Sequence, residues 1–173
     1  YIGGKVDPVI MRVLDVLIAF PSLVLTLAVA QSLGPSLTNT IFALAFFSIP
    51  AVARVARAAT LSLRELPFMT AAELAGTPWW RMLLRHIVPN IAPQLITFSM
   101  LGMGTVIVIE GALSFLGLGI PAPNPSWGNM ISEGQASLSA TPDLVIWPSL
   151  ALFVTVLAFN LLGEALRTHW SGR

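Results

Sequence analysis

The amino-acid sequence predicts an all-α membrane protein, a bundle of transmembrane helices, from three observations. Of the 173 residues, 55% are hydrophobic and only 10% are charged, whereas soluble domains carry about 25% charged residues. The mean hydropathy is +0.82. The apolar residues are gathered in four long runs, without a strand pattern or an internal repeat. We therefore expect a chain that is surrounded largely by lipid.

Four apolar runs approach the length needed to cross a membrane, at residues 13–33, 36–53, 91–118 and 144–163. A hydrocarbon core about 30 Å thick requires about 20 apolar residues at a rise of about 1.5 Å each. The second run is the shortest and needs a locally thinner bilayer. Each run contains a proline, at which we expect a kink. These prolines are Pro21, Pro50, Pro93 and Pro148.

The positive charges predict the orientation of these four spans. All nine Lys and Arg residues fall in the segments 1–12, 54–90 and 164–173, whereas the loops 34–36 and 119–143 contain none. Because cytoplasmic loops carry the excess of Lys and Arg, both termini and the loop 54–90 are predicted to be cytoplasmic. The net charge of only +1 gives no basic field, so nucleic acid is not expected as a partner.

The loop 54–90 contains two short helical patterns. Pro67 suits the start of the first, and Gly76 can take the left-handed conformation that ends a helix. Thr77 and Pro78 are predicted to cap and begin the second, and Pro89 to end it.

In the second pattern, an α-helical period places four apolar side chains on one face and two arginines on another. The apolar residues are Trp80, Leu83, Leu84 and Ile87, and the arginines are Arg81 and Arg85. Composition leaves two interpretations open, an amphipathic helix in the lipid headgroups or a docking site for a partner.

Two motifs, TAAELAG…HIVPN at residues 70–90 and GALSFLGLG…PSWGNM at residues 111–130, resemble those of a known family, the ABC-importer permeases for dipeptides, oligopeptides and nickel. The stretch from Thr70 to Asn90 (TAAELAG…HIVPN) resembles the "EAA" loop of ABC-importer permeases, with Thr70 and Val88 where that family usually has Glu and Leu. The stretch from Glu110 to Met130 resembles the more specific "ALSFLGLG…PSWGNM" block. The segments 7–21 and 157–163 extend the resemblance over nearly the whole chain.

This resemblance implies the architecture of a larger assembly. Such permeases have six spans, so residues 1–173 are expected to be the C-terminal part of the transmembrane domain, with a cytoplasmic coupling loop at 54–90 and an extracytoplasmic loop at 119–143. The implied location is the plasma (inner) membrane of a bacterium or archaeon. The implied partners are membrane lipid, a second permease subunit, two cytoplasmic ATPase subunits and an extracytoplasmic solute-binding protein.

The implied function is that of a permease subunit which forms the pathway for peptides, nickel complexes or a related small solute and performs no bond chemistry. The sequence has no glycine-rich phosphate loop with its Lys-Ser/Thr, so ATP is expected to bind the partner ATPase, and no cofactor is expected in this chain. Two alternatives are a secondary transporter, which requires repeated halves or ion-coupling residues, and a membrane anchor or scaffold without transport activity.

The residues expected to couple the permease to its ATPase lie in the loop 54–90. Small residues allow close backbone approach, the neighbouring tryptophans Trp79 and Trp80 offer large contacts, and arginines can pair with an acidic rim. The coupling residues are Thr70, Ala71, Ala72, Gly76, Trp80, Arg81, Arg85 and Pro89. We expect Arg54 and Arg57 to be interfacial anchors rather than docking contacts.

Four further predictions concern single polar residues. Glu110 lies nineteen residues after Ile91, or roughly 28 Å along a helix, where it either makes a structural hydrogen bond or lines the solute path. Asp15 is expected to pair with Arg12 in the adjacent turn. Trp127 and Asn129 lie in the outer loop, which either caps the helix ends or contacts the binding protein.

Metal coordination is not expected in this chain. His86 and His169 have no second ligand at the spacing of a metal site, and the chain contains no cysteine.

Overall fold

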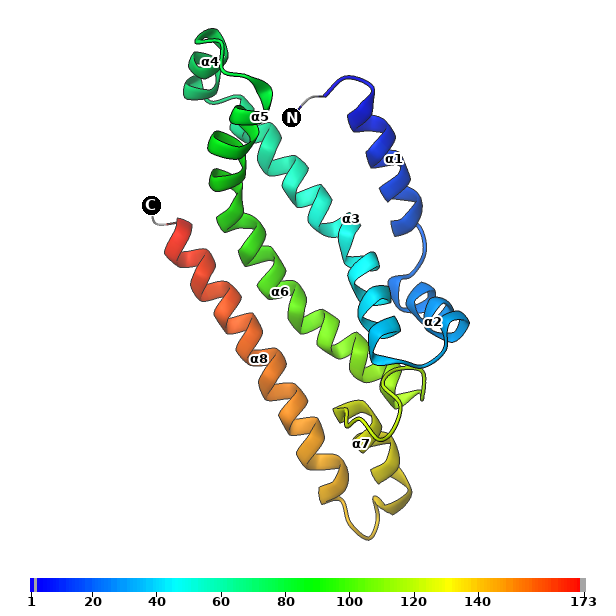
Figure 1. The fold of residues 1–173 in the computed structure, drawn as a ribbon. Helices are drawn as coiled ribbons and strands as arrows, with labels where there is room; N and C mark the ends of the chain where they lie inside the picture. The colour runs from blue at the N-terminus through cyan, green and yellow to red at the C-terminus, as the bar shows by residue number, and fades with distance from the viewer. Residues whose placement is uncertain (2, 172–173) are drawn as a thin grey trace.

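A computed structural model describes residue 1 and residues 3–171, and in these residues it contains helices and no strand. Figure 1 shows the long helices side by side. The predicted all-α fold is thereby confirmed. The α-helices are α1 (Val6–Ile18), α2 (Ser22–Leu33), α3 (Leu37–Arg64), α4 (Pro67–Leu74), α5 (Trp79–Arg81), α6 (Val88–Phe115), α7 (Trp127–Gly134) and α8 (Asp143–Ser171). A π-helix, η1 (Met82–Ile87), joins α5 to α6, and a short 3-10 helix, η2 (Gln135–Ser137), follows α7.

Three helices are long and apolar enough to cross a membrane: α3, the continuous stretch Trp79–Phe115, and α8. Their 28 or more residues correspond to at least about 42 Å of helix. The first predicted run, 13–33, is not one helix. It belongs to α1 and α2, which bend by 84° at the break between them, so the bent pair counts as a fourth span only if both parts are taken together.

The break between α1 and α2 lies at Pro21, which is the N-cap of α2. Proline has no backbone N–H to continue the helix, and it disfavours the helical conformation of the residue before it. The predicted kink is therefore a complete interruption. Pro50, Pro93 and Pro148 lie inside helices that continue past them.

The second predicted run ended too early. It was placed at residues 36–53, whereas the helix α3 continues to Arg64. Ser36 caps its start, since the Ser36 hydroxyl accepts a hydrogen bond from the Asn39 N–H. Residues 51–64 contain neither proline nor glycine and are rich in alanine, which favours helix. The start of the charged segment at Arg54 therefore does not mark a helix end.

The helices α6 and α8 pack closely along their length through glycines. A Cβ atom on Gly104 would lie 2.9 Å from Asn160 Nδ2, and one on Gly163 would lie 2.8 Å from Leu101 Cδ2. Gly111 is similarly close to Leu152. Small residues let helix backbones approach within a membrane, where packing rather than water exclusion drives association.

Tyr1, the last turns of α8 and the helices α4 and α5 lie at one end of the bundle, and α7 lies at the other (Figure 1). Exposed apolar side chains cover the long helices, among them Phe153 and Leu161 on α8. In water such a surface would be costly, whereas lipid accommodates it. Arg173, one of the nine positive charges, lies outside the described residues.

We expect Gly104→Val to destabilise the protein by about 1–3 kcal/mol, because its side chain must displace α8. Gly102→Val is the matched control, since a Cβ atom at Gly102 meets nothing within 4 Å. The measurement is thermal unfolding of both variants of the full-length protein in detergent. Equal melting temperatures for the two variants would contradict the close packing of α6 on α8.

Candidate functional site

The helices α4 and α5 form a tip beyond the long helices, and Gly76 turns the chain between them. Gly76 has a φ of +73°, the left-handed conformation that was predicted. The Thr77 N–H donates to the Ala72 carbonyl, and the Gly76 N–H to the Glu73 carbonyl. These two bonds form the Schellman motif that closes many helices. Pro67 occupies the first turn of α4, as predicted.

The second helix of the tip begins and ends differently from the prediction. Pro78, not Thr77, is the N-cap of α5, and no side chain caps it. Pro89 does not end the helix, because η1 carries the chain into α6 and places Pro89 in its first turn. Because proline has no backbone N–H, it makes no hydrogen bond back into η1, yet the helix continues past it. The tip is therefore continuous with the long helix α6.

The π-helix η1 also changes which side chains of this segment are buried against the rest of the bundle. Met82 and Ile87, five residues apart, are buried, whereas Trp80 and Leu84 are exposed. The predicted shared face of Trp80, Leu84 and Ile87 is wrong, because a π-turn inserts an extra residue and rotates the helix faces that follow. Met82 and Ile87 pack with Met69 of α4 and anchor the tip to the bundle.

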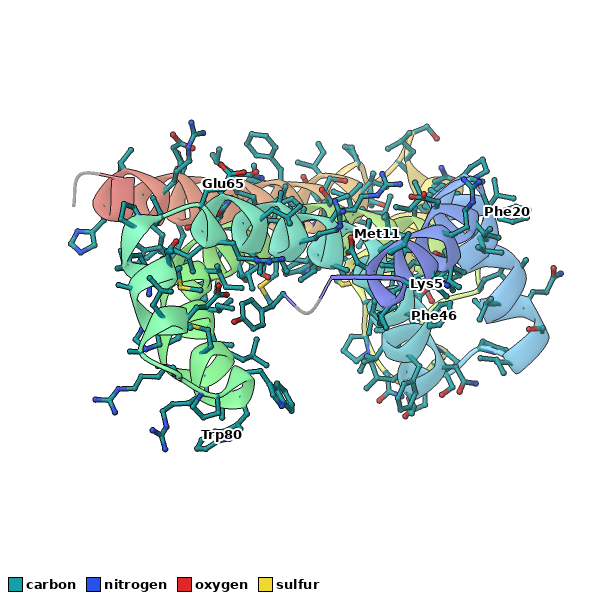
Figure 2. The ribbon with its side chains drawn as sticks, turned by 90° about the horizontal axis from the view of Figure 1, so that it is seen from above. Lys5, Met11, Phe20, Phe46, Glu65 and Trp80 are labelled. Carbon is teal, nitrogen blue, oxygen red and sulfur yellow. The ribbon has the colours of Figure 1, made fainter. Side chains whose placement is uncertain are left out.

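The outward side of the tip forms the coupling surface, which we define by its exposed residues. The side chain of Leu74 is 85% exposed and that of Trp79 is 59% exposed. The Arg81 guanidinium lies 5.1 Å from the centre of the Trp80 ring, and Trp80 points away from the bundle (Figure 2). The coupling surface comprises Thr70, Ala71, Leu74, Gly76, Trp79, Trp80, Arg81, Leu84 and Arg85.

Two of the predicted coupling residues, Ala72 and Pro89, do not lie on the coupling surface. Ala72 is half-buried and packs against the core beneath the tip, so it does not belong to the coupling surface. Pro89 is exposed but lies in the first turn of α6. Leu74 and Leu84 belong to the surface although the sequence argument did not select them for coupling.

Tyr1 adds a contact at the base of the tip that sequence reasoning missed. Its hydroxyl donates a hydrogen bond to the Glu73 carboxylate at 3.2 Å, and the Arg64 guanidinium lies 5.5 Å from its ring centre. Burial, followed by the bond to Glu73, raises the pKa of Tyr1. The contact ties the start of the chain to α4 and to the end of α3.

Two ion pairs join α1 to α3. The Arg57 guanidinium donates two hydrogen bonds to Asp7, at 2.7 and 2.6 Å, and the Arg54 guanidinium donates one to Asp15 at 2.6 Å. The predicted pair of Arg12 with Asp15 is wrong, because the fold brings α3 across this side of α1. Arg54 and Arg57 thus form ion pairs between helices, and their expected role as interfacial anchors stays a prediction.

Glu110 belongs to a hydrogen-bonded network at the opposite end of the bundle. The Ser114 hydroxyl donates to the Glu110 carboxylate at 2.6 Å and accepts from the Ile120 N–H at 3.1 Å. The Asn129 amide donates to the Ile120 carbonyl at 2.6 Å. The geometry gives Glu110 the structural hydrogen bond that was one of its two predicted roles.

The glycines of the outer loop allow this network to form. A Cβ atom on Gly128 would overlap the Gly111 carbonyl, and one on Gly119 would overlap Ser114. Ser126 caps α7 by accepting a hydrogen bond from the Asn129 N–H, and Trp127 is half-buried beside it. The motif residues between 110 and 130 therefore hold the loop and α7 against the end of α6.

Comparison with known proteins identifies the family. Residues 1–173 match the family described as "Binding-protein-dependent transport system inner membrane component". The chain belongs to this family. The resemblance to ABC-importer permeases of the peptide and nickel kind is thereby confirmed.

Relatives of this inner membrane component include glutathione transport system permease proteins, named GsiD. That of Pectobacterium atrosepticum is 44% identical over 167 residues, which cover 96% of this chain and 56% of the relative. That of Escherichia coli is 45% identical over 167 residues, covering 96% and 55%. The GsiD of Shigella flexneri is 45% identical over 164 residues, covering 95% and 54%. The chain thus spans about half the length of the curated relatives it matches.

For this inner membrane component we expect the π-helix to decide which tip residues react with a thiol reagent. In a full-length protein without other cysteines, Leu84→Cys should react with a water-soluble maleimide, because Leu84 is 64% exposed. Met82→Cys should not react, because Met82 is fully buried. Labelling of both cysteines at similar rates in folded protein would contradict this arrangement.

Proposed function

We propose that this chain is the permease subunit of an ATP-driven importer, and that the coupling surface docks on a cytoplasmic ATPase subunit. The observation that carries this proposal is the exposure of Leu74, Trp79 and Trp80 at a tip beyond the spans. Burying apolar surface yields about 25 cal/mol per Å², so these residues gain most from a partner that covers them. Family membership supports an ATPase as that partner.

The charges of the coupling surface suit an acidic partner surface. Arg81 and Arg85 are both exposed, and arginine forms bidentate pairs with carboxylates. Thr70 and Ala71 carry small side chains beside them, which permits close approach by the partner. The same mixture of tryptophan and arginine also suits lipid headgroups, so the experiment below separates docking from membrane anchoring.

Movement of the tip would be transmitted through one continuous helical segment. Residues Trp79–Phe115 run from the coupling surface to the outer loop over 37 residues, or about 55 Å. The close packing of α6 on α8, together with the outer network around Ser114, makes this segment part of a stiff unit. We infer that closure of an ATPase pair rocks this unit against a second permease subunit.

We propose that the end carrying the tip and both termini faces the cytoplasm. The described Lys and Arg residues lie on α1, α3, the tip and the last turns of α8, or just before α1, and the segment 86–166 contains none. This distribution follows the positive-inside rule. The Leu84→Cys protein also tests the orientation, because a membrane-impermeant maleimide should label it only after cells are opened.

We propose a small peptide as the solute and an extracytoplasmic binding protein as its donor. The relatives named above are permeases of a glutathione transport system. Trp127 and Asn129 lie at the end opposite the tip, where a binding protein would deliver the solute. With a second permease subunit and two ATPase subunits, this chain would then form the transport complex in the inner membrane.

We expect Gly76→Val to impair ATPase recruitment, or to uncouple ATP hydrolysis from uptake, while membrane insertion is retained. A left-handed conformation costs a residue with a Cβ atom about 1 kcal/mol or more, so the turn between α4 and α5 should distort. The measurements are co-purification of the ATPase with the full-length permease, and ATP-dependent uptake in vesicles.

Gly34→Val is the matched control for this prediction. Gly34 also has a positive φ, of +82°, and space around its Cβ position, but it lies between α2 and α3 rather than at the tip. Its ψ of 155° places it in a region that is essentially confined to glycine, so Gly34→Val should bear at least as much backbone strain and still recruit the ATPase normally. Wild-type recruitment, hydrolysis and uptake by Gly76→Val would return the tip to the role of a membrane anchor.

A further inference from the structure

A large cavity lies between the helices α1, α2, α3 and α6. Its volume is about 910 Å³, which is at the upper end of the range of about 300–1,000 Å³ for small-molecule sites. Its wall is mostly apolar, with Phe47 and Phe98 from the two long helices. Hydroxyl groups interrupt this wall at Ser48, Ser99 and Thr105. Such a surface, apolar with a few polar groups, is typical of sites that bind small organic molecules.

Arg54 is the feature of this cavity that points to a ligand charge. Of the described residues that line the cavity, Arg54 alone carries a charge. The Arg54 side chain is 46% exposed, so its guanidinium is accessible rather than enclosed by the protein. A guanidinium binds carboxylates with paired N–H donors.

The pairing of Arg54 leaves donors available for a ligand. Its guanidinium donates one hydrogen bond, to Asp15, out of the five N–H donors that the group carries. Arg57, one turn along α3, instead uses two atoms to hold both oxygens of Asp7 and does not line the cavity. Arg54 and Arg57 therefore both pair with a carboxylate of α1, but only Arg54 lines the cavity.

We propose that this cavity binds the solute during transport, and that Arg54 receives a carboxylate of a small anionic peptide there. This inference rests on the proposed importer function and names the chemistry of its solute. The hydroxyls of Ser48 and Ser99 lie on the same wall and can bond the peptide amides. Asp15 keeps the Arg54 charge compensated when the cavity holds no anion.

The test uses the complete transporter, with its second permease, ATPases and binding protein, in vesicles of phosphatidylcholine with ATP supplied to the ATPases. Initial uptake of radiolabelled glutathione is measured for wild type, Arg54→Gln, Arg54→Lys, Arg57→Gln and Asp15→Asn. Uptake of neutral and cationic peptides of similar size, measured in the same vesicles, separates a solute carboxylate from a lipid phosphate as the partner of Arg54. Thermal unfolding and basal ATP hydrolysis check that each variant is assembled.

Arg54→Gln should lower uptake about ten- to a hundredfold, as expected for one charge-assisted hydrogen-bonded contact. Arg54→Lys should recover a large part of this loss because it keeps the charge. Arg57→Gln should remain near wild type. Asp15→Asn removes the same ion pair as Arg54→Gln but leaves the cation in the cavity, so it should also retain uptake.

Three results with the variants would overturn the proposal. They are wild-type uptake by Arg54→Gln, an equal loss in Arg57→Gln, or an equal loss in Asp15→Asn, because the last two mean that the pairs only hold α1 on α3. If Arg54→Gln does not assemble, the other two variants test the proposal. Uptake retained by both Asp15→Asn and Arg54→Lys supports it, and an equal loss in both overturns it. ATP-dependent uptake of neutral or cationic solutes but not of anionic peptides would refute this inference alone. The absence of ATP-dependent uptake of any of these solutes by the wild-type complex would instead refute the importer function.

Discussion

The close packing of α6 against α8 is the interaction on which the other parts of the structure depend. Gly104, Gly111 and Gly163 remove the side chains that would separate the two backbones. Because α6 continues through η1 into α5, this packing fixes the direction of the tip. At the other end, Gly128 lacks the Cβ atom that would overlap the Gly111 carbonyl, so α7 can lie against the same helix. One helix pair thus positions both the coupling surface and the outer loop.

The helices α1 and α2 contrast with this unit. They are separated by a break at Pro21 and bend by 84°, and two ion pairs at the surface of the chain join α1 to α3. The cavity lies between this broken element and the continuous helices α3 and α6. Movement of α1 and α2 relative to the α6–α8 pair would change the shape of the cavity, as the proposed importer function requires.

The sequence predicted the elements that local chemistry determines. The long apolar runs, the helix start at Pro67 and the left-handed turn at Gly76 follow from composition and from single residues with strong conformational preferences. The motif between 110 and 130 was identified by resemblance, and the structure adds its physical reason: Gly119 and Gly128 permit backbone contacts that a side chain would block.

Features that depend on distant residues were missed or wrong. The π-helix at 82–87 has no simple sequence signal, and it separates the exposed Leu84 from the buried Ile87, which were predicted to share one face. Asp15 has Arg12 as its near neighbour in sequence, but the fold offers Arg54. The second run was predicted to end just before Arg54, because hydropathy falls at the first arginine. Hydropathy does not show that Arg54 and Arg57 pair with Asp15 and Asp7 while the helix continues. Sequence periodicity describes one helix at a time, whereas these features arise between helices or from a change in helix type.

The central claim is that the tip, α6 and α8 move as one stiff unit when the ATPase cycles. It is tested most directly by the distance between spin labels at Leu84→Cys on the tip and Leu138→Cys beyond η2, both exposed positions. In the full-length transporter complex, the account predicts one narrow distance distribution that is the same without nucleotide and with ATP trapped. A shift or a broadening of this distribution with ATP, in a complex that still transports solute, would contradict it.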